Sequence, residues 1–252
     1  MAPAFPADFP PGSGTLYTLG LGPGDPELLT LKAARILREV PVFAHFAKRG
    51  RDGNARTIAA PHLPPGAEEL RFEYPYTTEI PVGDPRYAAG IAGFYEDCAA
   101  VLAARLRAGQ DVALLCEGDP FFYGSSMYLF DRLRDGFRQE VVPGITAMSG
   151  CWTRTRTPIV HGDDILTVLP GTLDGERMAE RLRGTDAAVI MKVGRNLPKI
   201  RVALAAAGLT ARALYVERGT MAEERIVPLA ERDDAPAPYF SLVLVPGRQR
   251  AR

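Results

Sequence analysis

The sequence predicts an α/β protein of two lobes, and three observations carry this prediction. Strand-like and helix-like patterns alternate through most of the chain, which is typical of sheets with helices on both faces. The run DVALLC (111–116) follows a helical pattern and is almost wholly apolar, as central parallel strands are. In the final third, two strand patterns follow each other with no room for a helix. We therefore expect a mostly parallel N-terminal sheet and a mixed C-terminal sheet with an antiparallel end.

The predicted elements of the N-terminal lobe follow from apolar periodicity and turn residues. Strands are expected at 15–21, 40–46, 70–74 and 111–116, with a short fifth strand in QEVVPG (139–144). Helices are expected to end near Glu39, to span Tyr87–Ala108 before Gly109, and to span Met127–Arg134. Residues 48–66 are predicted to form a loop because they are rich in glycine and proline.

The C-terminal lobe shows the same alternation and then becomes more strand-rich. A helix in TAMSGCWTRTRTP (146–158) leads into a linker at 157–164. Strands are predicted at 165–170, 187–193 and 212–217, with helices near 176–183 and 197–207. ERIVPL (224–229) and YFSLVLV (239–245) are the final strands, and the acidic run 231–238 between them is predicted to be a surface turn. The expected division is a disordered Pro/Gly tail at 1–13, an N-terminal lobe at 14–143 and a C-terminal lobe at 144–252.

Composition excludes several classes of partner. Lys plus Arg and Asp plus Glu each count 30, so the formal net charge is zero and nothing draws the chain to nucleic acid or a membrane surface. No apolar run is long enough to span a membrane, and MAPAFPADFPPGSG lacks the basic start and apolar core of a secretory signal. The 3 scattered cysteines are expected to be reduced thiols in a cytoplasmic protein. The 3 histidines show no ligand spacing, so we expect no protein-bound metal.

The glycine-rich stretch LGLGPGDPELLT (19–30) resembles a phosphate-binding turn only in part. Gly20 and Gly22 fit the dinucleotide pattern G-x-G-x-x-G, but Asp25 occupies the third glycine position, and the lysine of a P-loop is missing. Asp25 is predicted to cap a turn that begins at Pro26, with its carboxylate where a bound anion would lie, and Thr30 is a second predicted cap. Two interpretations remain open: a tight, well-capped turn, or a wall without side chains for a neutral or cationic ligand.

Two further loops are expected at strand ends, where ligands bind in open α/β sheets. EGDPFFYGSS (117–126) follows the apolar strand and carries two carboxylates, which suit an amine or sulfonium better than a phosphate. VVPGITAMSG (141–150) ends a strand at Pro143-Gly144, and Thr146 is predicted to cap the next helix and to offer its hydroxyl to a carboxylate. Three such loops in one chain favour a single shared cleft.

The ordered set G-x-G-P-G-D-P-x-x-L-T, G-D-P-x-x-Y-G and V-P-G-I-T-A resembles the tetrapyrrole (corrin/porphyrin) methyltransferase family, the class III S-adenosylmethionine-dependent methyltransferases. The resemblance runs from about Leu16 to Val245. Within the family, MSGCW, GDDILTVLPGT and VIMKVGR are most similar to the branch that methylates carbon 20 of precorrin-2, giving precorrin-3A in cobalamin biosynthesis. The chain lacks the F-G-R-G-G loop end of the uroporphyrinogen branch.

This resemblance implies a two-lobed homodimer with S-adenosyl-L-methionine folded between the lobes and S-adenosyl-L-homocysteine as the product. It implies that cofactor-binding residues come from the three loops and from strands of the C-terminal lobe. These residues are Pro23, Glu117, Gly118, Asp119, Phe122, Thr146, Ala147, Met191, Leu214, Ser241 and Leu242. Leu214 and Ser241 are placed by approximate alignment.

The resemblance also implies a substrate rich in carboxylates, which arginines bind well. The loop and element-end candidates are Arg51, Arg56, Arg71, Arg154, Arg156 and Arg195, while Gly22, Gly24 and Asp25 would lie against the macrocycle. Methyl transfer from a sulfonium is an in-line displacement that needs no metal, only alignment and exclusion of water. The catalytic base stays unidentified, with Tyr123 and Asp25 as candidates.

Four alternatives remain open from the sequence. The first is the same methylation of cobalt-precorrin-2, and the second is methylation of another ring carbon. The third is a nucleotide-binding hydrolase or dehydrogenase that uses the opening glycines, and the fourth is a tetrapyrrole carrier without catalytic activity. A nucleotide-binding enzyme would show a larger thermal shift with ATP or NAD than with S-adenosylhomocysteine, whereas a carrier would bind the macrocycle and have no affinity for S-adenosylhomocysteine.

Overall fold

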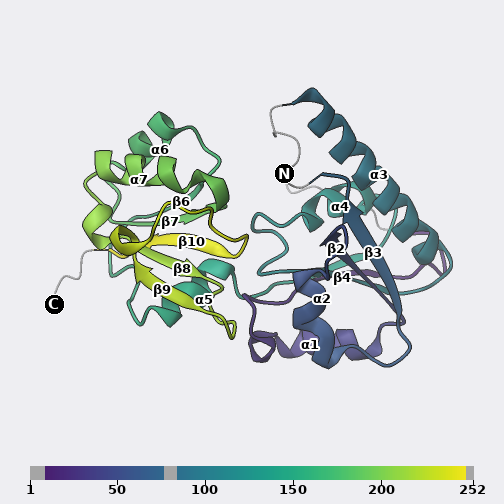
Figure 1. Ribbon diagram of the computed structural model, residues 1–252. Coiled ribbons are helices and arrows are strands. Elements are labelled where there is room, and N and C mark those ends of the chain that lie inside the picture. The colour runs from purple at the N-terminus through teal and green to yellow at the C-terminus, as the bar shows by residue number, and fades with distance from the viewer. Residues whose placement is uncertain (1–8, 77–83, 248–252) are drawn as a thin grey trace. The chain divides into compact units, whose positions relative to one another are not determined.

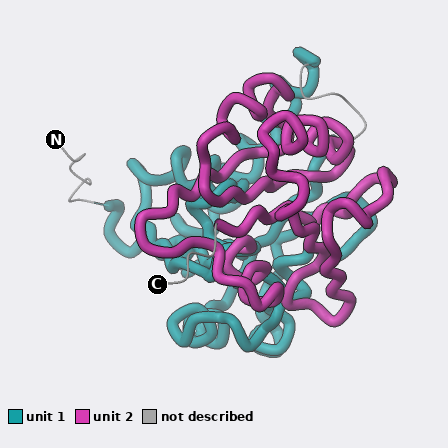
Figure 2. Tube along the Cα trace, turned by 90° about the vertical axis from the view of Figure 1, so that its left-hand side faces the viewer, with its two compact units in different colours: residues 1–146 teal, residues 147–252 magenta. Residues whose placement is uncertain are grey.

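The computed structural model describes residues 9–76 and 84–247. The chain divides into two compact units, Met1–Thr146 and Ala147–Arg252, each with its own sheet and its own hydrophobic clusters (Figure 2). The sequence-based boundary lies after residue 143. Of the tail predicted at 1–13, residues 1–8 lie outside the described residues, and Ser13 closes a turn by donating its N–H to the carbonyl of Pro10.

Unit 1 is built on a five-stranded parallel sheet in the order β3-β2-β4-β1-β5. Its strands are β1 (Leu16–Gly20), β2 (Val42–Lys48), β3 (Glu68–Tyr74), β4 (Val112–Cys116) and β5 (Gln139–Val142). All pairings are parallel, and β4 is buried along its whole length, as the apolar run predicts. Strand order puts the carboxyl ends of β4, β1 and β5 side by side, which are the ends from which the three motif loops depart.

Helices cover both faces of this sheet, as predicted (Figure 1). The helices α3 (Pro85–Arg107) and α4 (Ser126–Leu133) pack on one face through residues such as Leu102 and Leu129. The opposite face is covered by α1 (Leu31–Glu39) and α2 (Asn54–Ala59), through residues such as Leu37 and Ile58. Each sheet face therefore has its own hydrophobic cluster.

The turn after β1 has the two predicted caps. Asp25 accepts the N–H of Glu27 at 2.9 Å and starts the 3₁₀ helix Pro26–Leu28, with Pro26 in its first turn. Thr30 accepts the N–H of Ala33 at 3.1 Å and starts α1. The stretch 25–30 is thus a separate turn, and this prediction is confirmed.

The loop predicted for residues 48–66 is wrong in its central part. Residues Asn54–Ala59 form α2, and the 3₁₀ helix Ala60–His62 continues it. Glycines and prolines on both sides of this six-residue helix make the stretch resemble a loop in the sequence. Contacts with other elements stabilise the helix, and its own helix propensity does not. The stretch PYTTEIPVGDP (75–85), which the sequence predicts to be a second loop, falls mostly on residues 77–83, outside the described residues.

Unit 2 contains a mixed sheet in the order β6-β7-β10-β8-β9, which confirms the predicted C-terminal sheet. Its strands are β6 (Leu166–Pro170), β7 (Ala187–Met191), β8 (Leu214–Glu217), β9 (Arg225–Pro228) and β10 (Ser241–Val245). Only β6 and β7 pair in parallel, while β10 runs antiparallel to both of its neighbours and β9 runs antiparallel to β8.

The helices of unit 2 also lie on two faces of their sheet (Figure 1). The helices α6 (Gly175–Leu182) and α7 (Leu197–Ala206) bury one face, and α5 (Ala147–Arg154) packs on the other. Short 3₁₀ helices connect the elements at Gly194–Asn196, Thr210–Arg212 and Leu229–Glu231. Within the described residues, no helix is long and apolar enough to cross a membrane.

The segment between β9 and β10 differs from the predicted surface turn at two residues, since Ala237 packs in the core and Arg232 is buried. Arg232 is only 6% exposed, and its guanidinium lies 5.0 Å from the ring centre of Tyr215. It donates to the carbonyls of Asp233 and Ala235 and pairs with the Asp233 carboxylate. A buried arginine therefore holds this segment against the sheet, although its other charged residues are exposed.

Candidate active site

The three motif loops meet in unit 1 at the carboxyl edge of the parallel sheet. Leu21 donates its N–H to the carbonyl of Cys116 at 2.9 Å. Gly22 and Gly118 then form a two-way antiparallel bridge, with N–H to carbonyl distances of 2.8 and 3.3 Å. The loops after β1 and β4 are thus joined through their backbones, as the expectation of a shared site requires.

Glycines make this close approach possible. A Cβ atom on Gly144 would lie 2.1 Å from the carbonyl oxygen of Gly118, and one on Gly20 would lie 2.5 Å from the nitrogen of Gly144. Gly118 also has φ of 66°, a left-handed conformation that favours glycine. The glycines therefore serve first to let three backbones touch, a role in addition to the flat wall that the sequence suggests.

Asp119 joins the second loop to the third. Its Oδ2 accepts the N–H of Gly144 at 3.1 Å, and its Oδ1 accepts the N–H of Phe121 at 2.9 Å. Both carboxylate oxygens are therefore engaged by backbone amides. A carboxylate held in this way braces the loops and still presents negative charge at the carboxyl edge of the sheet.

Glu117 is turned toward helix α2. Its Oε1 accepts the N–H of Ala55 at 3.2 Å. Burial raises the pKa of the Glu117 carboxyl, while the Ala55 N–H and the nearby His45 ring counteract this effect. The sequence placed this side chain among the cofactor contacts, but in the structure its carboxyl is bonded to the protein itself.

The aromatic end of the second loop is partly exposed. Tyr123 is 40% exposed, and its ring packs edge-on against Phe122 with centroids 5.0 Å apart. Tyr123 has φ of 59°, which is uncommon for an aromatic residue and carries a cost of about 1 kcal/mol or more. The bonds of Asp119, together with the Ser126 hydroxyl donating to the Pro120 carbonyl at 3.1 Å, hold the loop in this shape.

Two glycine-loop residues predicted to face the substrate have special backbone geometry. Gly22 has φ of 77° and Gly24 has φ of 150°. Pro23 lies between them, and Asp25 is engaged as the cap described above. Thr146 is the last residue of unit 1 and precedes α5, which starts at Ala147; a capping bond by Thr146 stays a prediction.

Four of the five predicted cofactor residues of unit 2 share one hydrophobic cluster, but they do not all lie at one end of the sheet. Met191, Leu214, Leu242 and Ala147 belong to the same hydrophobic cluster, on the face covered by α5. Met191 is the last residue of β7 and Ser241 is the first of β10. Because these strands are antiparallel, both residues lie at the same end of the sheet. Leu214 pairs with Leu244, near the opposite end of β10. Leu214 therefore lies several residues away from Met191 and Ser241.

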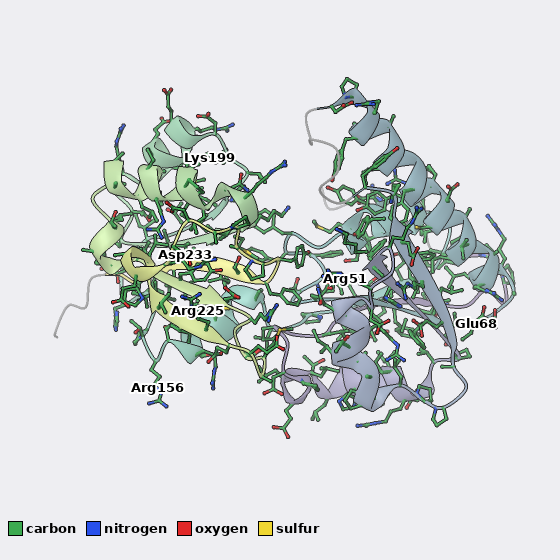
Figure 3. All side chains as sticks on the ribbon, viewed as in Figure 1. Arg51, Glu68, Arg156, Lys199, Arg225 and Asp233 are labelled. Atoms are coloured by element: carbon green, nitrogen blue, oxygen red, sulfur yellow. The ribbon has the colours of Figure 1, made fainter. Side chains whose placement is uncertain are left out.

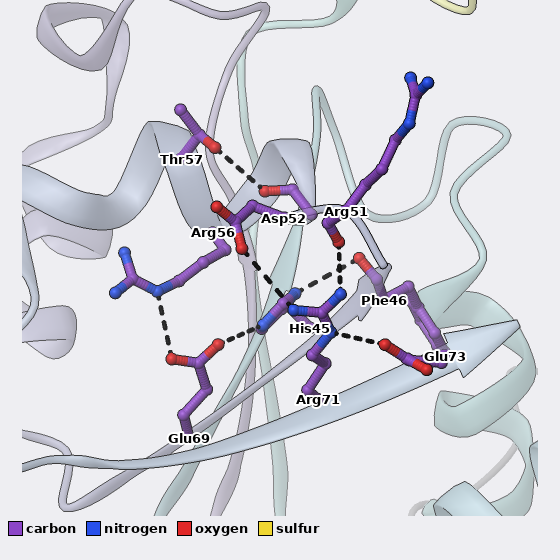
Figure 4. A network of polar contacts seen from close by, with 10 residues as sticks. His45, Phe46, Arg51, Asp52, Arg56, Thr57, Glu69, Arg71 and Glu73 are labelled. Atoms are coloured by element: carbon purple, nitrogen blue, oxygen red, sulfur yellow. Dashed lines mark hydrogen bonds and ion pairs between the residues drawn. The ribbon is translucent and has the colours of Figure 1, made fainter. Parts of the chain in front are cut away.

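Three of the predicted substrate arginines are held by the protein's own carboxylates. Arg56 donates to Glu69 at 3.3 Å, and Arg71 pairs with Glu73 at 3.0 Å and Asp52 at 3.6 Å (Figure 4). In unit 2, Arg154 pairs with Glu224 at 2.8 Å. Their guanidinium groups would have to exchange partners to bind a substrate carboxylate.

The other three arginines are exposed. Arg51, Arg156 and Arg195 form no ion pair with any residue that the structure describes. Arg51 is labelled in Figure 3, and in Figure 4 its side chain extends away from the network while its carbonyl accepts a bond from Arg71 at 2.6 Å. Of the cluster formed by Arg51, Arg56 and Arg71, Arg51 alone presents a guanidinium without a carboxylate partner among the described residues.

Comparison with known proteins agrees with this geometry. The family model described as Tetrapyrrole (Corrin/Porphyrin) Methylases matches residues 15–233. The chain belongs to this family of methyltransferases. Among its relatives, a precorrin-2 C(20)-methyltransferase from Sinorhizobium sp. is 56% identical over 94% of this chain and 96% of the relative.

Two other relatives show how the similarity is distributed. The cobalamin biosynthesis protein CobIJ of Mycobacterium tuberculosis (strain ATCC 25618 / H37Rv) is 46% identical over 94% of this chain, which spans only 47% of that longer protein. A cobalt-precorrin-2 C(20)-methyltransferase from Salmonella typhimurium is 30% identical over 92% of this chain and 96% of the relative.

Solved structures confirm the two-unit α/β fold. Uroporphyrin-III C-methyltransferase from Thermus thermophilus, complexed with S-adenosylhomocysteine, has a TM-score of 0.66 at 27% identity and covers 92% of each chain. A cobalt precorrin-4 methyltransferase has a TM-score of 0.71 at 21% identity, over 92% of this chain and 94% of that chain, and shows the fold alone. The family and fold predicted from the three motifs are therefore confirmed.

Proposed function

We propose that this chain transfers the methyl group of S-adenosyl-L-methionine to carbon 20 of precorrin-2, giving precorrin-3A in cobalamin biosynthesis. The observation that carries this proposal is the 56% identity, over nearly the full length of both chains, with a protein named precorrin-2 C(20)-methyltransferase. The braced loops at the carboxyl edge of unit 1 support it, because ligands bind at this edge in open α/β sheets.

S-adenosyl-L-methionine supplies, when bound, an electrophilic methyl group on a sulfonium. The residues that the family resemblance implies for its binding, apart from Glu117, are Pro23, Gly118, Asp119, Phe122, Thr146, Ala147, Met191, Leu214, Ser241 and Leu242. The Asp119 carboxylate provides negative charge suited to a cation. Glu117 is left out of this set because its carboxyl accepts the Ala55 N–H.

The protein's main contribution is alignment and exclusion of water. A bond forms between carbon 20 and the methyl carbon, the sulfur–methyl bond breaks, and carbon 20 then loses its proton. Tyr123 and Asp25 stay candidates for the group that accepts this proton. Tyr123 is favoured, since its side chain is 40% exposed beside the cofactor loop, whereas the Asp25 carboxylate caps a 3₁₀ helix.

The carboxylates of the macrocycle are proposed to bind Arg51, Arg156 and Arg195, which have no ion pairs among the described residues. Gly22 and Gly24 would lie against the ring. Arg56, Arg71 and Arg154 are more weakly supported, because each is already paired.

The test is incubation of the purified protein with precorrin-2 and isotopically labelled S-adenosylmethionine. The expected product carries one labelled methyl group, which nuclear magnetic resonance assigns to carbon 20. The related alternative, methylation of cobalt-precorrin-2, is supported by the 30% identity with the Salmonella typhimurium protein. A parallel incubation with the cobalt complex separates the two substrates, and a methyl group found on another ring carbon would overturn the assignment to carbon 20.

We also propose that the enzyme is a cytoplasmic homodimer that needs no bound metal and no nucleic-acid or membrane partner. The zero formal net charge supports the absence of polyanionic partners. Light scattering coupled to size-exclusion chromatography tests the dimer, and activity after removal of metals by a chelator tests the metal. A monomer, or activity lost on chelation and regained with a metal, would contradict these proposals.

A further inference from the structure

Glu117 lies between strand β4 and the turn at Gly118 and Asp119, yet its side chain is committed to another element. Its carboxyl oxygen accepts the N–H of Ala55 at 3.2 Å. Ala55 is the second residue of α2 and is only 1% exposed. The end of β4 and the start of α2, which are 62 positions apart in sequence, are thereby tied together.

Helix α2 needs this contact because its own N-cap residue cannot supply one. The N-cap is Gly53, which has no side chain to accept an amide hydrogen. A larger residue does not fit there, because a Cβ would lie 2.4 Å from the carbonyl oxygen of Phe46 and 2.5 Å from Nδ1 of His45. Glu117 therefore acts as a cap from a neighbouring strand.

A second set of polar contacts joins α2 to β3 (Figure 4). His45 is fully buried on β2, and its Nε2 lies 2.8 Å from Oε1 of Glu69. The other oxygen of Glu69 accepts from Nε of Arg56, a residue of α2, at 3.3 Å. The buried His45 ring also lies against Gly53, and its proximity counteracts the rise in the pKa of the Glu117 carboxyl that burial causes. The contact of Glu117 with α2 and the contact of Glu69 with α2 therefore both involve His45.

The core completes the attachment. Ile58 and Ala59 of α2 pack in the same hydrophobic cluster as Leu115 of β4 and Leu21, the residue before Gly22. Movement of α2 would therefore disturb the strand ends that carry the first and second motif loops. Glu117, the residue that follows β4, adds a polar bond to α2 beside this apolar packing.

We propose that Glu117 is a positioning residue: its part-buried carboxyl caps α2 and so fixes the strand end from which the cofactor loop Gly118–Asp119 departs. This inference rests on the proposed function, because it assigns Glu117 a task in cofactor binding without contact to the cofactor. It replaces the direct cofactor contact that the family resemblance implies. Burial raises the pKa of the Glu117 carboxyl, which is consistent with a group that faces the protein interior.

The test compares Glu117→Gln, Glu117→Asp and Glu117→Ala in the full-length protein, with S-adenosylhomocysteine as the probe. Gln keeps an oxygen that can accept the Ala55 N–H, whereas Asp is one methylene shorter and Ala has no acceptor. We expect Gln to bind within about twofold of the wild type, and Asp and Ala to lose about tenfold in affinity, since small displacements of a binding loop have effects of this size. Calorimetric titration below the melting temperature of every variant measures these affinities.

The matched control is Glu140→Ala in the same unit. Glu140 is a partly exposed residue near the amino-terminal end of β5, and it pairs with Lys32. It should leave the affinity unchanged.

If Glu117→Asp and Glu117→Ala lower the melting temperature but keep wild-type affinity, Glu117 is only structural and the proposal is wrong. If Gln loses as much affinity as Ala, the carboxylate itself contacts the cofactor, and the proposal is also wrong. If Ala does not fold, Asp and Gln still decide. A wild-type protein that does not bind S-adenosylhomocysteine would instead refute the proposed function.

Discussion

The carboxylate of Asp119 accepts the backbone N–H of Gly144 across two loops that depart from different strands, at 3.1 Å. The same carboxylate accepts the N–H of Phe121 at 2.9 Å. One side chain thus holds the second motif loop in shape and joins it to the third. Backbone amides satisfy its charge, and Asp119 forms no ion pair with any residue that the structure describes.

Replacing Asp119 tests this bridge. Asp119→Ala leaves two backbone amides without their acceptor, and we expect the free energy of unfolding to fall by about 2 kcal/mol. Asp119→Asn should lose less, because its amide oxygen can still accept one of the two bonds. Urea denaturation measures both values. Equal stability of the wild type and the Ala variant would show that the bridge contributes nothing.

The contact between Gly144 and Gly118 predicts a severe effect of a single methyl group. In Gly144→Ala the new Cβ would lie 2.1 Å from the Gly118 carbonyl oxygen, so the loops must separate. We expect a loss of at least about 3 kcal/mol of stability and loss of cofactor binding. The control is Gly136→Ala, whose Cβ would lie 4.0 Å from its nearest neighbour and should change stability by less than about 0.5 kcal/mol. A Gly144→Ala protein as stable as this control would contradict the packing.

Arg51 is predicted to act on substrate and not on stability. Arg51→Ala should raise KM for the tetrapyrrole about tenfold, the size expected for a lost charge-assisted hydrogen bond, and leave S-adenosylhomocysteine affinity unchanged. The matched control is Arg49→Ala. Arg49 is exposed on the same loop, and its Nε lies 4.0 Å from Oε2 of Glu73. Steady-state kinetics decides, and equal KM values for the two variants would remove Arg51 from the substrate site.

The pair formed by Arg154 and Glu224 predicts a change of stability with pH. The hydrogen bond from Arg154 lowers the pKa of Glu224, with a further contribution from the N–H of Thr220. A carboxyl whose folded pKa is lowered stabilises the protein above its unfolded pKa, and this contribution disappears as pH falls through the folded value. Arg154→Met loses this contribution, so it should melt at a lower temperature than the wild type near pH 7, and the two curves should converge as pH falls through the folded pKa of Glu224. Melting temperatures from pH 3 to pH 7 measure it, and superimposable curves for the two proteins would refute the coupling.

The cysteines are predicted to be unreactive in the folded protein. Burial raises the pKa of Cys98, Cys116 and Cys151 to about 12 in each case. The thiolate needed for reaction is then almost absent at neutral pH. A thiol reagent at pH 8 should label none of the three within minutes, and all three after unfolding. Rapid labelling of the native protein would show that one of these sites opens.

Motifs that depend on neighbouring residues could be predicted from the sequence. Asp25 and Thr30 were identified as caps because a cap and its helix are adjacent in the chain. The apolar run of β4 likewise indicates a central strand by itself. The ordered loop motifs were sufficient for the family, which the family model and the structural neighbours confirm.

Features that depend on contacts between distant residues could not be predicted. Helix α2 is capped by Glu117 from another strand and starts at a glycine, so its local sequence resembles a loop. The burial of Arg232 depends on Tyr215, which lies on a separate strand. The pairing of Arg56, Arg71 and Arg154 with carboxylates is equally invisible in the sequence, and it reduces the set of well-supported substrate arginines to Arg51, Arg156 and Arg195.

The central claim is methylation of precorrin-2 at carbon 20, and single-turnover methyl transfer from labelled S-adenosylmethionine tests it most directly. With enzyme in excess over precorrin-2, the proposed function predicts one labelled methyl group per macrocycle, located at carbon 20, and one equivalent of S-adenosylhomocysteine. No labelled macrocycle from either precorrin-2 or its cobalt complex, under conditions in which the protein binds S-adenosylhomocysteine, would contradict it.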